Sequence, residues 1–167
     1  PAELRKIMLR FPDKIIALHC EDEHMIDAQL EKYKNQFGED IPFSMHHEIR
    51  SAAACLSATQ DCIGVAQETG GRLHILHLTS GKETTCLDRS MPFEQKRITS
   101  EVCVQNLLFC DEDYHKLGRK IKWNPSIKTA DDRAQLWEAL LDDRLDIIAT
   151  DHAPHTWEEK QEDYIHA

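Results

Sequence analysis

Residues 146–156 read Asp-Ile-Ile-Ala-Thr-Asp-His-Ala-Pro-His-Thr, a short apolar run that ends on an acid, two histidines and a proline. Buried parallel strands are nearly continuous apolar runs, and enzymes built from alternating strands and helices carry their reactive side chains just beyond the C-terminal ends of such strands. The stretch therefore predicts a buried strand over 146–150, with Asp151 in the position of a catalytic carboxylate.

The rest of the chain alternates between apolar runs, which predict strands, and stretches with apolar residues three or four apart, which predict helices. Strands are expected at 14–20, 72–78, 97–104 and 146–150, with a further short run at 121–124 that Pro125 stops. Helices are expected at 22–37, 51–69, 81–89, 111–117 and 130–142, with a polar loop over 41–49. This alternation predicts an α/β fold in which helices cover a parallel sheet, in one domain spanning residues 1–167 without an internal boundary.

The composition disfavours several classes of function. The 167 residues include 30 acidic and 20 basic side chains, a net charge of −10, and nucleic-acid binding depends on Lys and Arg contacts to phosphate. No apolar run approaches the ~20 residues that cross a bilayer, and the sequence contains no secretion signal, so we expect a cytoplasmic protein. The six cysteines form no Cys-x-x-Cys pair and lie in apolar settings, so we expect reduced thiols.

Two other predicted strands end on a histidine, because the runs Ile-Ile-Ala-Leu and Leu-His-Ile-Leu lead to His19 and His77. Successive side chains of a regular strand point to opposite faces, so only one of His74 and His77 can join a shared site, and His77 lies at the C-terminal end. Side chains on strands about 4.8 Å apart can reach one ion, and two imidazoles with a carboxylate suit Zn²⁺. The pattern predicts a zinc site of His19, His77 and Asp151 that would activate water.

Simpler explanations exist for each of these side chains alone. A strand-end histidine is more often a hydrogen-bonded structural residue than a ligand, so the coincidence of three strand ends is what favours a metal site. His152 should face away from Asp151, which suits a supporting role. The acidic groups at 21–23 and 111–113 are explained as helix N-termini, where carboxylates interact favourably with the helix dipole. The other histidines are expected to be solvated or at the surface: His24, His46, His47, His115 and His166.

Four motifs, in this order, resemble one known family. They are His-Cys-Glu-Asp at 19–22, His-Leu-Thr-Ser at 77–80, Lys-Trp-Asn-Pro at 122–125 and Ala-Thr-Asp-His-Ala-Pro-His at 149–155. Together they resemble the second half of the dihydroorotases of the amidohydrolase superfamily, over nearly the whole chain. The last motif is the most specific, since a strand-end histidine is common to many amidohydrolases.

The resemblance implies about half of a TIM-type (β/α)₈ barrel, strands five to eight. It also implies a dinuclear zinc centre that interconverts N-carbamoyl-L-aspartate and L-dihydroorotate in pyrimidine biosynthesis. In that centre His19 and His77 would hold the second zinc. Asp151 would ligate the first zinc and carry a proton from the attacking water to the leaving amide nitrogen. Asn124 and His155 would bind the substrate, His155 through the substrate's carboxylate.

The chain departs from the family pattern at two places. Family members commonly have two histidines where this chain has Gln105 and Asn106, and often Pro-Leu-Arg where it has Ser-Ile-Lys at 126–128. Lys128 cannot offer the bidentate fork of an arginine, so an anion contact there would be altered. These departures concern the choice of substrate rather than the family.

A large part of the implied barrel is missing from this sequence. Such a barrel takes about 250 residues, and the His-x-His pair and bridging lysine or aspartate that the family carries on upstream strands do not occur here. We expect the chain to be a fragment that is inactive as an enzyme on its own and forms at most a weak mononuclear site. Its unpaired strand edges predict pairing with the missing half of the barrel, with another copy as a homodimer, or with a different partner.

Two alternative functions stay open. One is a cyclic amidase related to hydantoinase or allantoinase, which assays on those substrates would separate from a dihydroorotase. The other is a metal-free, dihydroorotase-like subunit that supports a partner enzyme, which a zinc content of about two ions per complete chain would exclude.

Overall fold

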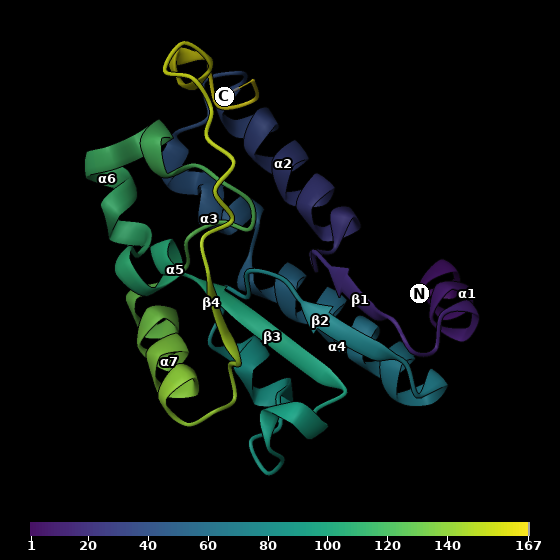
Figure 1. Ribbon diagram of the computed structural model, residues 1–167. Helices are drawn as coiled ribbons and strands as arrows, with labels where there is room; N and C mark the ends of the chain where they lie inside the picture. Colours follow the sequence, from purple (N-terminus) through teal and green to yellow (C-terminus); the bar gives the residue numbers. More distant parts are fainter. Residues whose placement is uncertain (167) are drawn as a thin grey trace.

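The computed structural model describes residues 1–166, in which four parallel strands form one sheet with helices packed on it (Figure 1). The strands are β1 (Ile15–Leu18), β2 (Arg72–Ile75), β3 (Ile98–Cys103) and β4 (Ile147–Ala149). Their spatial order, β1-β2-β3-β4, is also their order in the chain, and each neighbouring pair is parallel. Strands added one after another in a single direction are the arrangement of a barrel wall, whereas the strand order of a doubly wound sheet reverses.

Several helices begin or end at residues that make recognisable capping interactions. They are α1 (Ala2–Arg10), α2 (Glu23–Phe37), α3 (His46–Ile49), α4 (Ala52–Thr69), α5 (Val104–Leu108), α6 (Tyr114–Leu117) and α7 (Ala130–Leu141). The side chains of Asp22, Ser51 and Thr129 accept hydrogen bonds from backbone N–H groups in the first turns of α2, α4 and α7, which satisfies donors that have no partner within a helix. Gly70 ends α4 in the left-handed conformation, at φ 65°, which glycine adopts without strain.

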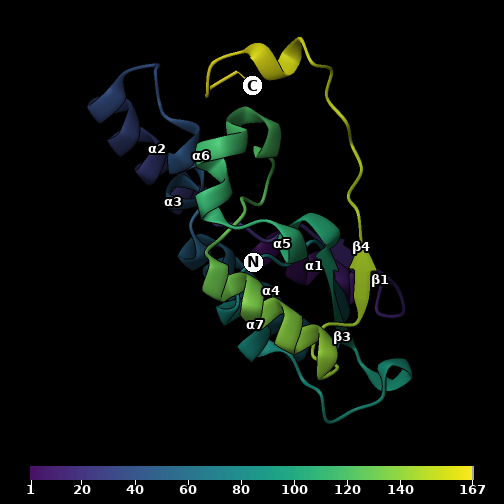
Figure 2. The ribbon, with the colours of Figure 1, turned by 90° about the vertical axis from the view of Figure 1, so that its left-hand side faces the viewer.

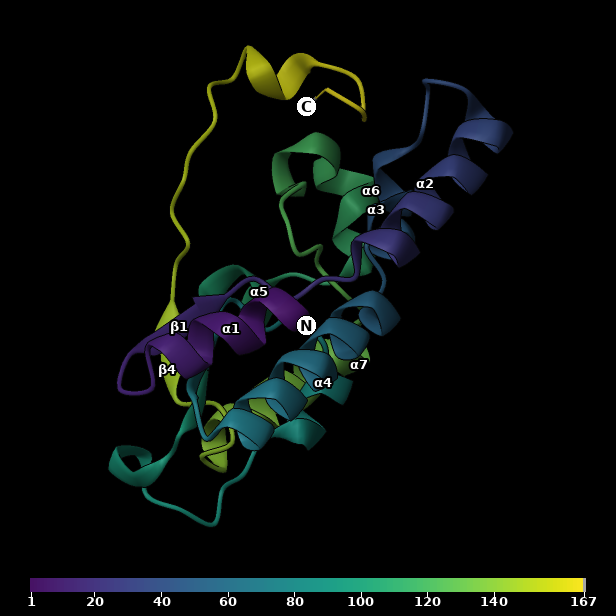
Figure 3. The same ribbon diagram turned by 90° about the vertical axis from the view of Figure 1, so that its right-hand side faces the viewer.

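One face of the sheet forms the main core against α1, α4 and α7. Leu73, Ile75 and Val102 point into this layer and are at most 1% exposed. Figure 3 shows α1 beside α4, which it contacts. The helices contribute Met8, Ile63, Val65, Ala66, Leu136 and Ala139 to the same cluster.

Within residues 1–166 no helix covers the opposite face of the sheet (Figure 1), which carries both polar and apolar side chains. Ala17, His74 and Thr99 occupy one row across β1, β2 and β3 on this face. Ile15, two residues before Ala17 and therefore on the same face, is 53% exposed. This is the face that would line the inside of a closed barrel.

The segment after β4 leaves the sheet along an extended path and returns to the chain near α2, α3 and α6 (Figure 2). Tyr164 anchors its far end, since this side chain is buried in a second cluster and its ring lies against Phe43 and His46. The segment therefore bridges the sheet and the α2–α3 region.

The expected parallel α/β architecture is confirmed, with several local differences, among them the helix α5, which was not expected. The second strand stops at Ile75 instead of continuing to 78, because the chain turns at His77. Residues 121–124 form no strand, since Ile121 completes a 3-10 turn and packs against Tyr114. The expected helix at 81–89 is a short 3-10 turn over Lys82–Cys86. The expected loop at 41–49 contains α3, whose last residue, Ile49, is buried in the second cluster.

Within residues 1–166 no helix combines the length and apolar character that a bilayer crossing requires.

Candidate functional site

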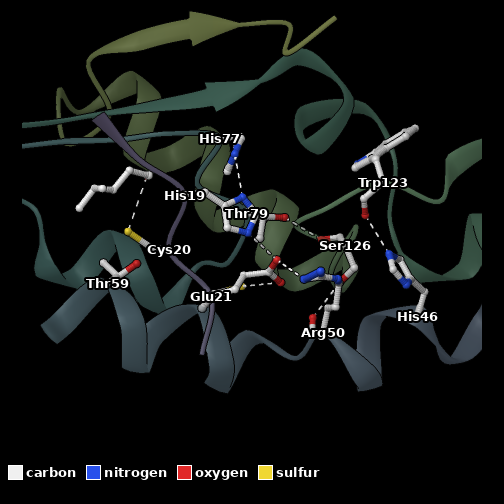
Figure 4. A network of polar contacts seen from close by, with 12 residues as sticks. His19, Cys20, Glu21, His46, Arg50, Thr59, His77, Thr79, Trp123 and Ser126 are labelled. Carbon is white, nitrogen blue, oxygen red and sulfur yellow. Dashed lines mark hydrogen bonds and ion pairs between the residues drawn. The ribbon is translucent and has the colours of Figure 1, made fainter. Parts of the chain in front are cut away.

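The C-terminal ends of β1 and β2 bring two histidines together. Leu18 pairs with Ile75 in the sheet, so the residues that follow leave neighbouring strands at the same level. Nδ1 of His19 lies 3.1 Å from Nε2 of His77, and the two rings meet edge to face with centroids 4.7 Å apart. Figure 4 shows this pair and the contacts that extend from it.

His77 reaches this position for a reason other than the one expected from strand alternation. The strand has ended at Ile75, and His77 has a φ of 37°. Its backbone N–H donates to Oε1 of Glu101, and Nε2 of His74 lies 3.2 Å from Oε2 of the same carboxylate. The backbone of His77 and the side chain of His74 therefore contact the same carboxylate, but only the side chain of His77 meets His19. Strand alternation does not set the direction of His77, because the strand ends before it.

A buried ion pair supports His19 from the other side. Nε2 of His19 lies 2.8 Å from Oε2 of Glu21, and Nη1 of Arg50 donates to the same oxygen at 2.5 Å. The Glu21 side chain is only 1% exposed. Burial would raise the pKa of Glu21, but the hydrogen bond from His19 and the positive charge of Arg50 lower it overall, so Glu21 is ionised at neutral pH.

The sequence interpretation missed Glu21. It assigned the acidic group at 21–23 to a helix N-terminus, and Asp22 does cap α2. Glu21, however, points back to His19. A carboxylate two residues after a strand-end histidine lies on the same side of an extended chain, and that spacing is the signal that could have found it.

The electrostatic surroundings keep His77 neutral. Burial and the neighbouring His19 lower its pKa, while the charges of Asp151 and Glu101 act in the opposite direction. Its Nδ1 atom is buried and has no hydrogen-bond partner. A neutral imidazole is the form that binds a metal.

The distance between the ring nitrogens of His19 and His77 is close to that expected for two ligands of one zinc ion. At the usual Zn–N distance of about 2.0–2.1 Å, two nitrogens of a tetrahedral site lie about 3.3 Å apart, and the observed separation is 3.1 Å. Among residues 1–166, no three His, Cys, Asp or Glu side chains are arranged to hold a metal ion. The predicted three-ligand set of His19, His77 and Asp151 is therefore not assembled among these residues.

The other predicted residues gather around one cavity. Asp151 follows β4 with a φ of 46° and is exposed. It lines a cavity of about 1220 Å³ together with Asn124 and His155. Nδ1 of His155 lies 3.4 Å from Glu159, and His152 borders the same cavity. The structure thus groups the predicted substrate residues with Asp151, while the histidine pair lies outside this lining.

The residues that depart from the family pattern have distinct surroundings. Gln105 lines the cavity and donates to the backbone oxygen of Thr150, next to Asp151. Asn106 is buried and donates to Oγ1 of Thr79 at 2.6 Å. Lys128 is also buried, with its Nζ donating to the backbone oxygen and the hydroxyl of Ser126. Lys128 therefore does not line the cavity in which an anionic substrate would be held.

His46 was expected at the surface, and that expectation is wrong. The side chain is 1% exposed, with Nδ1 2.8 Å from the hydroxyl of Tyr164 and Nε2 2.8 Å from the backbone oxygen of Trp123. Burial lowers the pKa of His46 to about 3. His46 is thus a neutral structural residue that ties the C-terminal segment to the loop before Asn124.

The fold is that of part of the barrel seen in hydantoinase structures. The L-hydantoinase of Arthrobacter aurescens superposes with a TM-score of 0.86 at 24% identity, covering 96% of this chain and 35% of that one. A D-hydantoinase from Thermus sp. gives a TM-score of 0.84 at 18% identity, covering 99% of this chain and 37% of that one. At these identities the likeness concerns the fold.

Sequence comparison finds dihydroorotases among the relatives of this chain. The dihydroorotase of Anoxybacillus flavithermus is 36% identical over 156 residues, which are 92% of this chain and 34% of that protein. The Bacillus subtilis dihydroorotase is 36% identical over 151 residues, or 89% of this chain and 33% of that protein. The chain is homologous to part of the dihydroorotases, so the resemblance of the four motifs is confirmed. It spans about a third of the length of the curated relatives it matches, and no family model matches the sequence.

Proposed function

We propose that this chain forms strands five to eight of the barrel of a zinc-dependent dihydroorotase, which interconverts N-carbamoyl-L-aspartate and L-dihydroorotate. The observation that carries the proposal is the His19–His77 pair, with nitrogens 3.1 Å apart at the ends of adjacent parallel strands. The homology to dihydroorotases supports the choice of reaction.

Nδ1 of His19 and Nε2 of His77 would hold zinc, and the remaining ligands would come from outside this chain. Zinc supplies a Lewis acid that makes water a nucleophile near neutral pH. His77 meets the chemical requirement for a ligand because burial lowers its pKa and keeps the ring neutral. Glu21 meets the requirement for an outer carboxylate, since it binds the second nitrogen of His19.

Asp151 is proposed to move the proton. In the direction of ring opening, its carboxylate accepts a proton from the attacking water and returns it to the ring amide nitrogen as the C–N bond breaks. Asn124 and His155 border the same cavity, and we assign them to substrate binding, with His155 at the carboxylate of the substrate. Asp151 has this role only in a complete barrel, in which the end of β4 would face the metal.

The rest of the barrel is the proposed partner of this chain. The edges of β1 and β4 have no strand beside them among residues 1–166, and Ile15 on the inner face is 53% exposed. Strand edges and apolar faces of this kind are normally covered in native proteins. On its own the chain would bind at most one zinc ion weakly and would not turn over substrate.

A graft into a relative tests the function. Replacing the matching third of the Bacillus subtilis dihydroorotase with this chain supplies the missing strands from a homologue. The graft should hydrolyse dihydroorotate, and His77→Ala in the graft should abolish turnover. Preferential turnover of hydantoin or allantoin would favour the cyclic amidase alternative instead. Turnover that survives His77→Ala would contradict the assignment of the histidine pair.

A metal-free supporting subunit is the remaining alternative. Such a chain has no need for an imidazole pair with an outer carboxylate, so the geometry around His19 favours the enzyme. Zinc analysis of the folded graft separates the two, since about two zinc ions per site is the enzyme's expectation.

A further inference from the structure

One oxygen of Glu21 contacts two different side chains. Oε2 lies 2.8 Å from Nε2 of His19 and 2.5 Å from Nη1 of Arg50. An arginine can only donate, so this oxygen is an acceptor for both groups. In the neutral ring, Nε2 of His19 must then carry the proton, and Nδ1 keeps its lone pair. That lone pair faces Nε2 of His77 at 3.1 Å.

From this geometry we infer that Glu21, held by Arg50, is a positioning residue that fixes the tautomer and ring orientation of His19, with Nδ1 as the metal-binding atom. The assignment of Nδ1 to a metal rests on the proposed function. The tautomer itself follows from the contacts and does not depend on any metal.

Arg50 is fixed at several points, which makes it a suitable anchor. It lies between α3 and α4, and its side chain is 20% exposed. Its backbone oxygen accepts from the hydroxyl of Ser126 at 2.8 Å, and the backbone oxygen of Ser126 accepts from Thr79 at 2.9 Å. Figure 4 shows this continuous path from His77 through His19, Glu21 and Arg50 to Ser126.

The path also links two parts of the proposed site. Ser126 lies two residues after Asn124, the proposed substrate residue, and Thr79 lies two residues after His77. Outer carboxylates that orient a metal-binding histidine typically change metal affinity by about 10- to 100-fold when removed. Glu21 should have an effect of this size.

The test uses the whole chain and two readouts, neither of which is enzyme activity. The first is the NMR signal of the imidazole N–H proton of His19 in metal-free protein with ¹⁵N-labelled histidine, at about pH 8, where an ordinary histidine is neutral. The second is the affinity for zinc measured by calorimetry. The variants are Glu21→Leu, which removes the acceptor, and Glu21→Gln, which keeps an amide oxygen facing Arg50.

Glu83→Gln is the matched control. Glu83 is also buried, at 2% exposure, but its partners are Thr59 and Ser80 and it does not contact His19. This variant shows what loss of a buried carboxylate does to the fold alone.

The wild type, Glu21→Gln and Glu83→Gln should show a protonated Nε2 in His19 with slow solvent exchange, and Glu21→Leu should lose this signal. Zinc affinity should fall about 10- to 100-fold in Glu21→Leu and stay within a few-fold in the other two. A proton on Nδ1 of His19 in the wild type, or an unchanged signal in Glu21→Leu, would overturn the inference. If the tautomer behaves as expected but no variant binds zinc, the positioning role stands and the proposed zinc function fails.

Discussion

At the scale of single residues, several side chains of the site are positioned by partners that lie far away in the sequence. His19 and His77 could be predicted because each follows an apolar strand, a pattern visible in a few consecutive letters. Glu21 and His46 could not, because their roles depend on Arg50 and Tyr164, which lie 29 and 118 positions away. A sequence pattern reports local periodicity and contains no information about such distant partners.

His46 makes the stability of the chain depend on pH. Burial lowers its pKa to about 3 from the 6.5 of an ordinary histidine, so the unfolded chain binds the proton more readily than the folded one between these values. Its contribution is therefore complete above pH 6.5 and is lost as the pH falls toward 3, by at most about 1.4 kcal/mol per pH unit.

Replacing His46 removes this part of the pH dependence. In His46→Gln the unfolding free energy, measured by urea titration at several pH values, should fall less steeply below pH 6.5 than in the wild type. His24→Gln, at an exposed position on α2, serves as the control. Identical slopes for His46→Gln and the wild type would show that His46 does not carry the effect.

At the scale of elements, the regular helices and strands were predictable and the irregular connections were not. The helix over 22–37 has an acidic cap at Asp22 and a glycine after its last residue, and the structure places α2 there. The end of β2 was misplaced because the apolar run continues through Leu76 and Leu78 while the backbone already turns at His77. Leu78 is buried in the core from this turn, so its hydrophobicity is explained without a strand.

The packing of β2 against the helices sets the stability of the sheet. Ile75 is 1% exposed and belongs to the main core, so Ile75→Ala should lower the unfolding free energy by about 2–5 kcal/mol. Ile148→Ala on β4, where the side chain is 55% exposed, should have a much smaller effect. Chemical denaturation of both variants measures the difference, and equal losses would contradict the burial of Ile75 in the main core.

At the scale of the whole molecule, the sheet is open where a barrel would be closed. The order β1-β2-β3-β4 leaves β1 and β4 as edges within residues 1–166, and the inner face carries the exposed side chains of Ile15 and Ile147. The motifs predicted this partial barrel, since the apolar runs and the strand-end residues occur in the barrel's order. They could not predict that Asp151 and the histidine pair form no three-ligand group within residues 1–166, because the spacing of the strand ends depends on the curvature of the sheet.

The isolated chain should self-associate through this open face. Ile15→Lys places a charge on the inner face near the β1 edge and should shift the sedimentation profile toward monomer. Leu141→Lys, at an exposed apolar position on α7, should leave association unchanged. A wild-type chain that stays monomeric across the concentration range would contradict the prediction.

Zinc binding by the chain tests the central claim most directly, because the claim is that His19 and His77 form one part of a zinc site. Calorimetric titration of zinc into the wild type should show weak binding of about one ion per chain, lost in both His19→Ala and His77→Ala. His74→Ala should keep it, since His74 contacts Thr99 and Glu101 instead of His19. Binding that persists in His77→Ala, or that disappears in His74→Ala alone, would contradict the account.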